Sequence, residues 1–534
     1  MKIVLAEKVS TATVAVFASE PDWQVVTHDQ IKNGLASELA DADALVVRSA
    51  VQVDSALLDA APKLRVIGRA GVGVDNIDAD AATRRGMVVM NTPGANAVAV
   101  AELTVCLMID LARMVPRANA TMHAAKWEKK SLQGTELRGK TLGIVGLGRV
   151  GLEVARRARA FGMELIGHDP FVAASIAREH GVTLAPVEEV LRTADYITLH
   201  VGLTSQTEGL INAKSLATMK KGVRIVNCAR GELIDEAALA EALRSGHVRG
   251  AALDVFHKEP LKDSAFFDLD NVILTPHIAG STAEAQEAVG VQIAEQVKAY
   301  LKLGVVQNAI NVASLSYEEY AEIAPYIGMA ESLGSLLAQI SAGNVESMKI
   351  AYNGRLATMR TELMRNAALC GVLSHHEQVN RINAASIATE RGIRVHEEKK
   401  EAVSGGASNV LKLTLHSPGG DLSASATVLH GSSSRLLAMD GIDIEASLHG
   451  TLLYIRNKDV PGVIGRIGTI LGEHAINIAS FALGRPDPKR VKSAGNAMAV
   501  IQFDAQTKRA EIAKAVAALQ AVDAITRVEL VELN

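Results

Sequence analysis

Short apolar runs alternate with amphipathic stretches of helical spacing through the first half of the chain. The runs have the length of buried strands and are bounded by polar or turn-forming residues. In a first unit they lie at residues 3–6, 43–48, 64–67 and 87–90. In a second unit they lie at residues 141–145, 164–168, 196–200, 223–227, 250–254 and 271–274. Strands that alternate with helices predict two α/β domains with parallel sheets, of the doubly wound Rossmann-like or flavodoxin-like kind.

The most apolar segment of the chain lies at residues 97–114. Glu102, Asp110 and Arg113 interrupt it within about 18 residues, which is near the shortest length that crosses a bilayer. The segment therefore predicts a buried helix rather than a membrane span. Its apolar surface also leads us to expect a homodimer at least.

A second strong helical pattern, at residues 283–301, follows the last strand of the second unit. We expect this helix to return the chain to the first unit. The expected boundaries are then a discontinuous domain at 1–96 and 283–312, with a domain at 97–282 inserted into it. A crevice between two such lobes can close around a ligand.

The pattern changes after residue 312. Residues 313–451 contain a helical pattern at 356–372 and a strand candidate near 410–415, and the charge run at 396–401 is expected to be solvated surface. We expect an α+β domain there. The remaining chain, 452–534, predicts strand, helix, strand, strand, helix, strand, which is the ferredoxin-like βαββαβ arrangement. Its predicted elements begin at 450 and continue at 463–473, 476–482, 497–504, 509–519 and 525–531.

A glycine-rich turn separates the predicted strand at 141–145 from a helical pattern at 152–161. Gly146, Gly148 and Gly151 have the GxGxxG spacing, which permits a tight turn, close approach to a pyrophosphate and close helix packing. The helix N-terminus adds free N–H groups for the same anion. Asp169 ends the next strand, where a carboxylate accepts hydrogen bonds from an adenosine ribose and repels the extra phosphate of NADP. These residues in this order predict an NAD site.

Three further stretches each carry one chemically useful residue after a predicted strand: Arg230, Glu259 and His277. Arg230 can fork onto the carboxylate and carbonyl of an oxo acid, and His277 can exchange a proton with its hydroxyl. Glu259 can orient and charge that histidine. Each residue alone has an ordinary structural explanation, so the hypothesis of a hydride-transfer site rests on the trio together with the NAD fingerprint.

Cations also follow two strands of the first unit. Arg48 and Ser49 come after one strand and Arg69 after another, at the carboxyl ends where open α/β sheets bind ligands. They favour an anionic substrate. The basic run at 126–130 is a further candidate for a phosphate, although solvated surface is the favoured interpretation for it.

The amino-acid composition argues against several classes of protein. The chain has 534 residues, 48% of them hydrophobic, with a net charge of -4, so nothing draws it toward nucleic acid or an acidic membrane. Three cysteines without CxxC spacing indicate neither a disulfide framework nor a metal site. The N-terminus has no apolar core of a signal peptide, and we expect a cytoplasmic protein.

Several longer motifs carry a family resemblance over essentially the whole length: residues 68–78, 91–96 and 139–151, and the three stretches around the trio. The chain resembles the long form of the D-3-phosphoglycerate dehydrogenase family, within the D-isomer specific 2-hydroxyacid dehydrogenases. The resemblance implies NAD-dependent oxidation of 3-phosphoglycerate to 3-phosphooxypyruvate, the first step of phosphorylated serine biosynthesis. It also implies that 313–451 is an intervening, allosteric substrate-binding domain and that 452–534 is an ACT domain.

The resemblance implies roles for individual residues. Arg230 and Glu259 assist His277 in catalysis. Cofactor contacts fall on Gly146, Gly148, Arg149, Val150, Gly151, Asp169, Val201, Cys228, Ala229, Arg230, Asp254, His277, Ala279 and Gly280. Substrate contacts fall on Arg48, Ser49, Arg69, Gly73 and Arg230. Some ACT domains of the family pair between subunits and bind L-serine at the joint, and Asp459 and Asn477 match those positions. The resemblance implies a homodimer or homotetramer.

Two alternatives stay open. Another D-2-hydroxyacid dehydrogenase, of the glyoxylate or hydroxypyruvate reductase type, has the same fingerprint and trio, but the long extension after residue 312 argues against it. An NAD-sensing corepressor-like binding protein is a second alternative, because a dehydrogenase fold can persist without catalysis.

Overall fold

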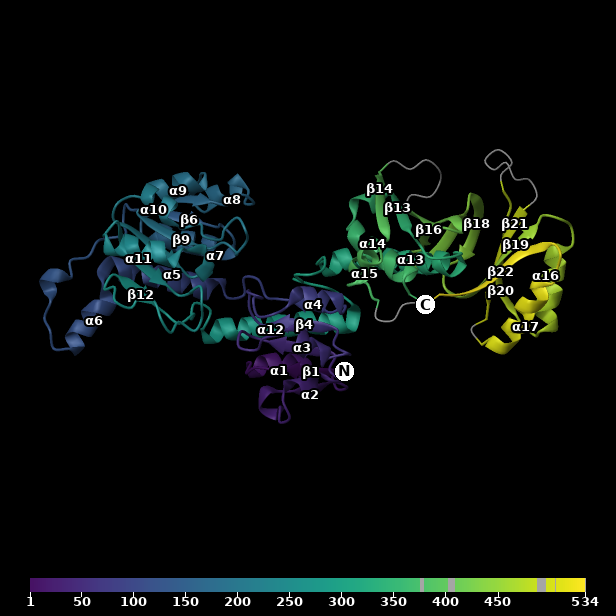
Figure 1. The fold of residues 1–534 in the computed structure, drawn as a ribbon, viewed down its shortest axis with the longest axis horizontal. Coiled ribbons are helices and arrows are strands. Elements are labelled where there is room, and N and C mark those ends of the chain that lie inside the picture. The colour runs from purple at the N-terminus through teal and green to yellow at the C-terminus, as the bar shows by residue number, and fades with distance from the viewer. Residues whose placement is uncertain (375–378, 402–408, 487–495, 505, 534) are drawn as a thin grey trace.

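A computed structural model describes residues 1–374, 379–401, 409–486, 496–504 and 506–533 of the chain. The strands within these residues form four sheets. Figure 1 shows an elongated molecule, with the two α/β units drawn in purple to teal and the C-terminal half in green to yellow. The predicted fold class, two α/β units followed by two α+β units, is confirmed.

The first sheet is parallel throughout and has the flavodoxin-like strand order 2-1-3-4-5. Its strands, in spatial order, are β2 (Gln24–Val26), β1 (Lys2–Leu5), β3 (Ala44–Val47), β4 (Val66–Arg69) and β5 (Val88–Met90). The nearby helices are α1 (Thr11–Ala18), η1 (His28–Gln30), α2 (Leu35–Leu39), α3 (Ser55–Asp59) and α4 (Ala79–Arg84). β3 is buried along its whole length because helices cover both faces of a parallel sheet.

Helix α12 (Ala283–Leu303) packs against this first sheet, although it follows the second unit in sequence. Ile293 and Val297 lie in one core with Ile3 and Leu5 of β1. A side chain at Gly68 would meet Ile293 at 2.7 Å, so glycine at this position of β4 permits the close approach. The chain therefore crosses between the two α/β units twice.

The second sheet is also parallel, in the order β12-β11-β10-β9-β6-β7-β8. Its strands are β6 (Thr141–Val145), β7 (Glu164–His168), β8 (Val182–Leu184), β9 (Tyr196–Leu199), β10 (Val223–Asn227), β11 (Val248–Leu253) and β12 (Val272–Leu274). The strand order reverses between β6 and β9, and such a switch point is where doubly wound sheets bind ligands.

The helices of this second unit include the long apolar segment that the sequence predicts. They are α5 (Ala97–Arg113), α6 (Val115–His123), η2 (Lys129–Ser131), α7 (Arg149–Ala160), α8 (Ala174–Glu179), α9 (Val187–Thr193), α10 (Ala213–Thr218), η3 (Gly231–Leu233) and α11 (Glu236–Arg244). α5 is a buried helix, as expected. Among the helices in the described ranges, none is long and apolar enough to cross a membrane.

The third unit is a mixed sheet covered by two closely packed helices. Its strands, in spatial order, are β14 (Arg394–Lys400), β13 (Ser347–Gly354), β15 (Asn409–Ser417), β16 (Gly420–Leu429), β17 (Ser433–Met439) and β18 (Ile442–Ser447). The helices are α13 (Tyr317–Ile340), η4 (Arg355–Thr358), α14 (Thr361–Val372) and α15 (Ala384–Glu390). β13 and β14 are parallel and the other pairs are antiparallel.

One sequence expectation needs correction in this unit. The helical pattern at 356–372 is not one helix, because the backbone is extended at Met359 between η4 and α14. The charge run at 396–401 is mostly exposed, as expected, and falls largely within edge strand β14. An edge strand pairs through its backbone on one side only, so charged side chains suit it and also block further pairing.

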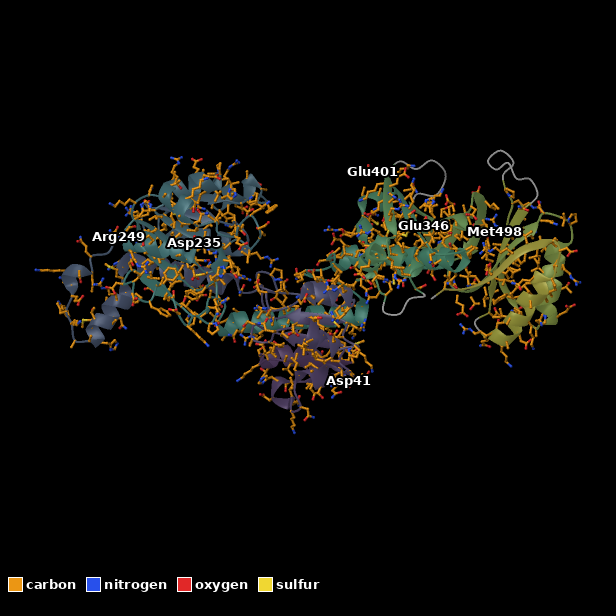
Figure 2. All side chains as sticks on the ribbon, viewed as in Figure 1. Asp41, Asp235, Arg249, Glu346, Glu401 and Met498 are labelled. Carbon is orange, nitrogen blue, oxygen red and sulfur yellow. The ribbon has the colours of Figure 1, made fainter. Side chains whose placement is uncertain are left out.

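The last unit has the predicted βαββαβ order and an antiparallel sheet. Its elements are β19 (Gly450–Lys458), α16 (Val463–Glu473), β20 (Ile478–Gly484), β21 (Asn496–Phe503), α17 (Arg509–Gln520) and β22 (Ile525–Leu533). The two helices cover one face of the sheet. Tyr454, Met498 and Val531 on the other face belong to the same core as Leu337 of α13. Figure 2 labels Met498 near the point where the last unit meets the third. The third and fourth units thus share a hydrophobic core.

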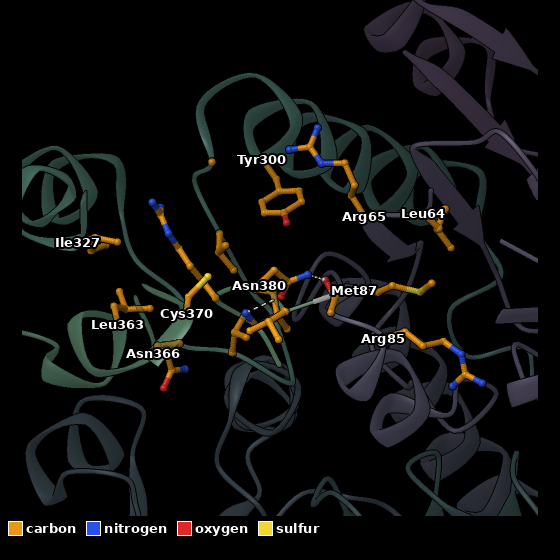
Figure 3. A pocket seen from close by; sticks show the side chains of 18 of the residues that line it. Leu64, Arg65, Arg85, Met87, Tyr300, Ile327, Leu363, Asn366, Cys370 and Asn380 are labelled. Atoms are coloured by element: carbon orange, nitrogen blue, oxygen red, sulfur yellow. Dashed lines mark hydrogen bonds between the residues drawn. The ribbon is translucent and has the colours of Figure 1, made fainter. Parts of the chain in front are cut away.

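A cavity of about 830 Å³ lies between the first and third units. Figure 3 shows Met87 and Tyr300 on one side of it and Leu363 and Cys370 on the other. Asn380 bridges the two units at its edge, donating from Nδ2 to the carbonyl of Gly86 at 3.0 Å. Burial raises the pKa of the Cys370 thiol to about 12, so this cysteine is a neutral, weakly reactive lining group.

The contact between α13 and α14 gives a stability prediction. A Cβ at Gly371 would lie 2.0 Å from the carbonyl oxygen of Glu331, whereas a Cβ at Gly328 of α13 would meet nothing within 4 Å. We expect Gly371→Ala to destabilise the protein by about 1–3 kcal/mol through overpacking. Gly328→Ala is the matched control and should stabilise it by about 0.4–1 kcal/mol. Urea unfolding followed by circular dichroism would test this, and equal midpoints for both variants would contradict it.

Candidate active site

A cleft of about 880 Å³ opens between the two α/β units, at the carboxyl ends of their strands. This volume is in the range of about 300–1,000 Å³ typical of small-molecule sites. Residues predicted from separate stretches of sequence line it together: Arg48, Ser49 and Arg69 from the first unit and Arg230, Glu259, His277 and Gly280 from the second. The tertiary structure therefore brings the trio and the strand-end cations to one place.

The side chains of His277 and Glu259 form a hydrogen-bonded pair. His277 Nδ1 lies 2.7 Å from Glu259 Oε2, and Glu259 Oε1 accepts a hydrogen bond from the backbone N–H of Phe256 at 3.0 Å. A carboxylate at Nδ1 selects the tautomer that donates from that nitrogen. Nε2, the other ring nitrogen, is then the atom that can accept a proton.

A buried carboxylate holds the backbone that carries His277. Asp254 is 0% exposed, and Oδ1 accepts from Thr275 Oγ1 at 2.6 Å and from the N–H of Ile278 at 2.9 Å. Oδ2 accepts from the N–H of Ala279 at 2.9 Å. His277 itself has a positive φ of 53°, which is uncommon for a residue other than glycine. The buried network at Asp254 thus fixes a strained turn at the site.

Hydrogen bonds within its own loop hold Arg230 in place. The side chain of Asn227, 1% exposed, donates to the carbonyl of Arg230 at 2.7 Å and accepts from the N–H of Ala229 at 3.0 Å. Arg230 Nη1 donates to the carbonyl of Ala229 at 2.7 Å, and Nη2 lies 3.1 Å from Asp75 Oδ2. Sequence reasoning missed both Asn227 and Asp75, although both lie within motifs that it singled out.

The two strand-end arginines have different surroundings. Burial, followed by the charge of Arg230, lowers the pKa of Arg69 from its usual value, and its Nε is buried without a hydrogen-bond partner. The loop of Arg48 is held by Glu7, whose Oε1 accepts from the backbone N–H of Arg48 at 2.8 Å and of Val51 at 3.1 Å. Glu7 has no sequence signal, because its partners lie more than 40 residues away.

The glycine turn has the geometry that a dinucleotide requires. Gly146 has a φ of 95°, and a Cβ there would lie 2.5 Å from the carbonyl oxygen of His200. A Cβ at Gly151 would lie 2.0 Å from the carbonyl oxygen of Gly146, whereas the space beside Gly148 is open within 4 Å. The start of α7 leaves first-turn N–H groups for an anion there. These residues fit a pyrophosphate.

Arg149 and Val150 begin α7, and Arg149 Nη1 donates to the carbonyl of Pro93 at 2.5 Å. Asp169 follows β7 and links the two loops beside this turn. Its Oδ2 accepts from the N–H of Leu147 at 2.8 Å, and its Oδ1 accepts from the N–H of Phe171 at 2.8 Å. Asp169 therefore stands at the predicted ribose position, with remaining lone pairs available.

The remaining predicted cofactor positions surround the same edge of the sheet. The side chain of Val201 lies against the Gly146 turn. Burial raises the pKa of the Cys228 thiol to about 12 and lowers that of the His200 imidazole to about 3. Both side chains are therefore neutral near pH 7. Ala279 is buried, and Gly280 lies close to Asn96.

The two predicted effector residues do not meet within one chain. Asp459 follows β19 and pairs with Arg485 at 3.2 Å, at the end of the sheet where β20 finishes. Asn477 precedes β20 and donates to Asp504 at 2.6 Å, at the opposite end. A ligand that contacts both positions requires two chains.

A doubly wound dinucleotide unit, a cleft between two lobes and a His–Glu pair facing arginines define the class of NAD-dependent 2-hydroxyacid dehydrogenases. Three family models match the chain. Residues 105–279 match the NAD binding domain of D-isomer specific 2-hydroxyacid dehydrogenases, residues 322–440 the D-3-phosphoglycerate dehydrogenase intervening domain, and residues 451–520 the ACT domain.

Full-length relatives agree with these matches. The D-3-phosphoglycerate dehydrogenase of Methanocaldococcus jannaschii is 42% identical over 91% of this chain and 93% of its own length. That of Bacillus subtilis is 42% identical over 93% of each chain, and that of Mycobacterium tuberculosis strain H37Rv is 39% identical over 90% of this chain and 91% of its own. The chain belongs to the D-3-phosphoglycerate dehydrogenase family.

Two similar solved structures each match a share of this chain that corresponds to the length of the two α/β units. The TT0316 protein of Thermus thermophilus is 33% identical and a glyoxylate reductase of Paecilomyes thermophila is 31% identical, each with a TM-score of 0.53 over 58% of this chain. They cover 100% and 98% of their own chains. The part of this chain that they match thus corresponds to almost the whole of each neighbour.

Replacement of His277 tests its role. If Nε2 accepts the substrate proton, His277→Gln lowers kcat by about 10²- to 10⁴-fold while NAD affinity changes little. Steady-state kinetics and NAD titration would measure both. His28→Gln, an exposed histidine outside the cleft, is the control. Near-normal turnover of His277→Gln would remove it from the mechanism.

Replacement of Asp169 tests the ribose contact. We expect Asp169→Ala to raise KM for NAD by about ten- to one-hundred-fold, since a hydrogen bond to a charged group contributes about 1.5–3 kcal/mol. The ratio of kcat/KM with NADP to that with NAD should rise as well, because the carboxylate no longer repels a phosphate. Glu241→Ala on α11 is the control and should leave the ratio of kcat/KM with NADP to that with NAD unchanged. A loss of activity equal for both cofactors would indicate only structural damage.

Proposed function

We propose that the protein catalyses the NAD-dependent oxidation of 3-phospho-D-glycerate to 3-phosphooxypyruvate, the first step of phosphorylated L-serine biosynthesis. The observation that carries the proposal is the His277–Glu259 pair in one cleft with Arg230 and two further arginines. Relatives named D-3-phosphoglycerate dehydrogenase, which align over about nine-tenths of the chain, support it.

Each residue of the trio has a distinct task in this reaction. Arg230 holds the substrate carboxylate through its guanidinium fork. His277 Nε2 takes the proton of the C2 hydroxyl, and Glu259 stabilises the imidazolium through the hydrogen bond at Nδ1. NAD, when bound, supplies the acceptor for the C2 hydride. The Asp254 network keeps the imidazole aimed at the cleft throughout.

The substrate phosphate adds close to two negative charges at neutral pH. Arg48 and Arg69 line the same cleft as the trio, and Arg69 has a buried Nε without a partner in this structure. We assign the phosphate to these two arginines, with Ser49 beside them, whereas Gly73, the other predicted substrate contact, lies against Arg230. Residues 126–130 do not line the cleft within one chain, so any contribution from that run comes from a second subunit.

The two alternatives explain less of the chain. A glyoxylate or hydroxypyruvate reductase requires only the first 58% of it, the part that the solved neighbours cover. An NAD-sensing binding protein has no use for a His–Glu pair facing a substrate-sized cleft. The intervening and ACT domains favour a regulated biosynthetic enzyme over both alternatives.

We propose domain boundaries at 96/97, 282/283, 312/313 and 451/452, where the chain passes between cores. We also propose a homodimer or homotetramer, because paired ACT domains would let Asp459 of one chain and Asn477 of the other contact one L-serine molecule. We assign the protein to the cytoplasm, where its unpaired cysteines remain reduced.

An initial-rate assay with NAD tests the substrate. We expect kcat/KM for 3-phospho-D-glycerate to exceed that for D-glycerate by about 10²- to 10⁴-fold, because two charge-assisted hydrogen bonds contribute about 1.5–3 kcal/mol each. The reverse reaction should favour 3-phosphooxypyruvate over hydroxypyruvate and glyoxylate. Equal or better rates with the unphosphorylated acids would support the reductase alternative.

The same assay tests regulation. We expect L-serine to inhibit the wild-type protein, with D-serine as the stereochemical control. Asn477→Ala should weaken this inhibition without changing kcat, since the residue lies in the ACT domain and outside the cleft. Inhibition that is unchanged in this variant would place the effector elsewhere.

A further inference from the structure

We propose that Asp75 is a resident counter-ion of Arg230 which the substrate carboxylate displaces, so that Asp75 sets the affinity of the cleft for carboxylic acids. The proposal rests on the function proposed above only in that Arg230 receives the carboxylate. It assigns Asp75 no part in hydride or proton transfer.

The geometry places the carboxylate of Asp75 and that of the substrate in competition for the guanidinium of Arg230. Arg230 Nη2 lies 3.1 Å from Asp75 Oδ2, while Nη1 is engaged by the carbonyl of Ala229. A Cβ at Gly73 would lie 2.2 Å from Arg230 Nη2 and 2.8 Å from Asp75 Oδ2, so the ion pair rests directly on the backbone of Gly73. A fork onto a guanidinium uses Nη2 together with either Nη1 or Nε, so a substrate carboxylate bound in this way meets Asp75 at the same nitrogen.

The charges around Asp75 favour its replacement by the more negatively charged substrate. Asp75 raises the pKa of Arg69, whereas burial and the charge of Arg230 lower it, so one acid lies within electrostatic range of two arginines. In the free protein Asp75 offsets their mutual repulsion. A substrate with a carboxylate and a phosphate brings more negative charge than Asp75 and replaces it in that role. Once the substrate is bound, Asp75 repels it.

The exposure of Asp75 suits a side chain that a ligand must displace from Arg230. Its side chain is 70% exposed, compared with 29% for Arg230. A half-exposed ion pair is weak, because solvent screens it and holding the side chains costs entropy. The released carboxylate can move into water at little cost, whereas Arg230 stays fixed by the Asn227 network.

The pair also connects the two lobes. Asp75 belongs to the loop between β4 and α4 of the first unit, and Arg230 follows β10 of the second. In the ligand-free protein this contact holds the mouth of the cleft in one arrangement. Displacement of Asp75 removes that contact at the moment when the acid binds.

Asp75→Asn tests the proposal, with Asp75→Glu and Asp80→Asn as controls. Asn keeps the shape of Asp75 without its charge, Glu keeps the charge, and Asp80 is an exposed acid of α4 that does not line the cleft. We expect Asp75→Asn to lower KM for 3-phosphooxypyruvate by about two- to five-fold, as the loss of an exposed ion pair predicts. The change should fall on KM rather than on kcat, and neither control should reproduce it.

Oxalate is the probe that separates this proposal from the proposed substrate. Its dissociation constant for the NADH-bound protein, measured by titration calorimetry, should fall by the same factor in Asp75→Asn. That result would hold even if 3-phosphooxypyruvate were not a substrate. A rise in KM and in the oxalate constant would show that Asp75 positions Arg230 instead. Unchanged constants would show that the pair does not compete with the acid, and either result overturns the proposal.

Discussion

The return of α12 to the first sheet is the constraint on which the site depends. Because this helix packs its apolar face into the core of β1 and β4, the chain must leave the first unit, build the second and come back. The carboxyl ends of two parallel sheets then face one crevice. Neither sheet alone holds both the cations and the histidine, so the site exists only between the lobes.

Within the crevice, buried polar groups act as a scaffold for exposed charged ones. Asp254 and Asn227 are almost fully buried and use their side chains to hold the loops of His277 and Arg230. The groups that they position stay partly exposed, with His277 at 52% and Arg230 at 29%. Rigid support beneath an accessible side chain is what proton transfer and ligand exchange require.

The C-terminal half is joined to the catalytic half by fewer contacts than join its own two units. The third and fourth units share one hydrophobic core. The third unit and the first face each other across a large cavity, and Asn380 donates a hydrogen bond between them at its edge. Tyr300 of α12 and Met87, which directly precedes β5, line that cavity on the side of the first unit.

The local features can be predicted from the amino-acid sequence, because strand periodicity, the GxGxxG turn and the acid after β7 depend on neighbouring residues. It predicted the two parallel sheets and the βαββαβ tail, and it singled out the trio. It did not predict α13 or most of the third sheet, although β15 to β18 pair as successive antiparallel strands and β15 and β18 alternate buried and more exposed residues. The long-range contacts become known from the folded chain: Asp75 with Arg230, Glu7 with the Arg48 loop, and Asp254 with the His277 turn. Such contacts depend on how the chain crosses between lobes, and no local pattern encodes that path.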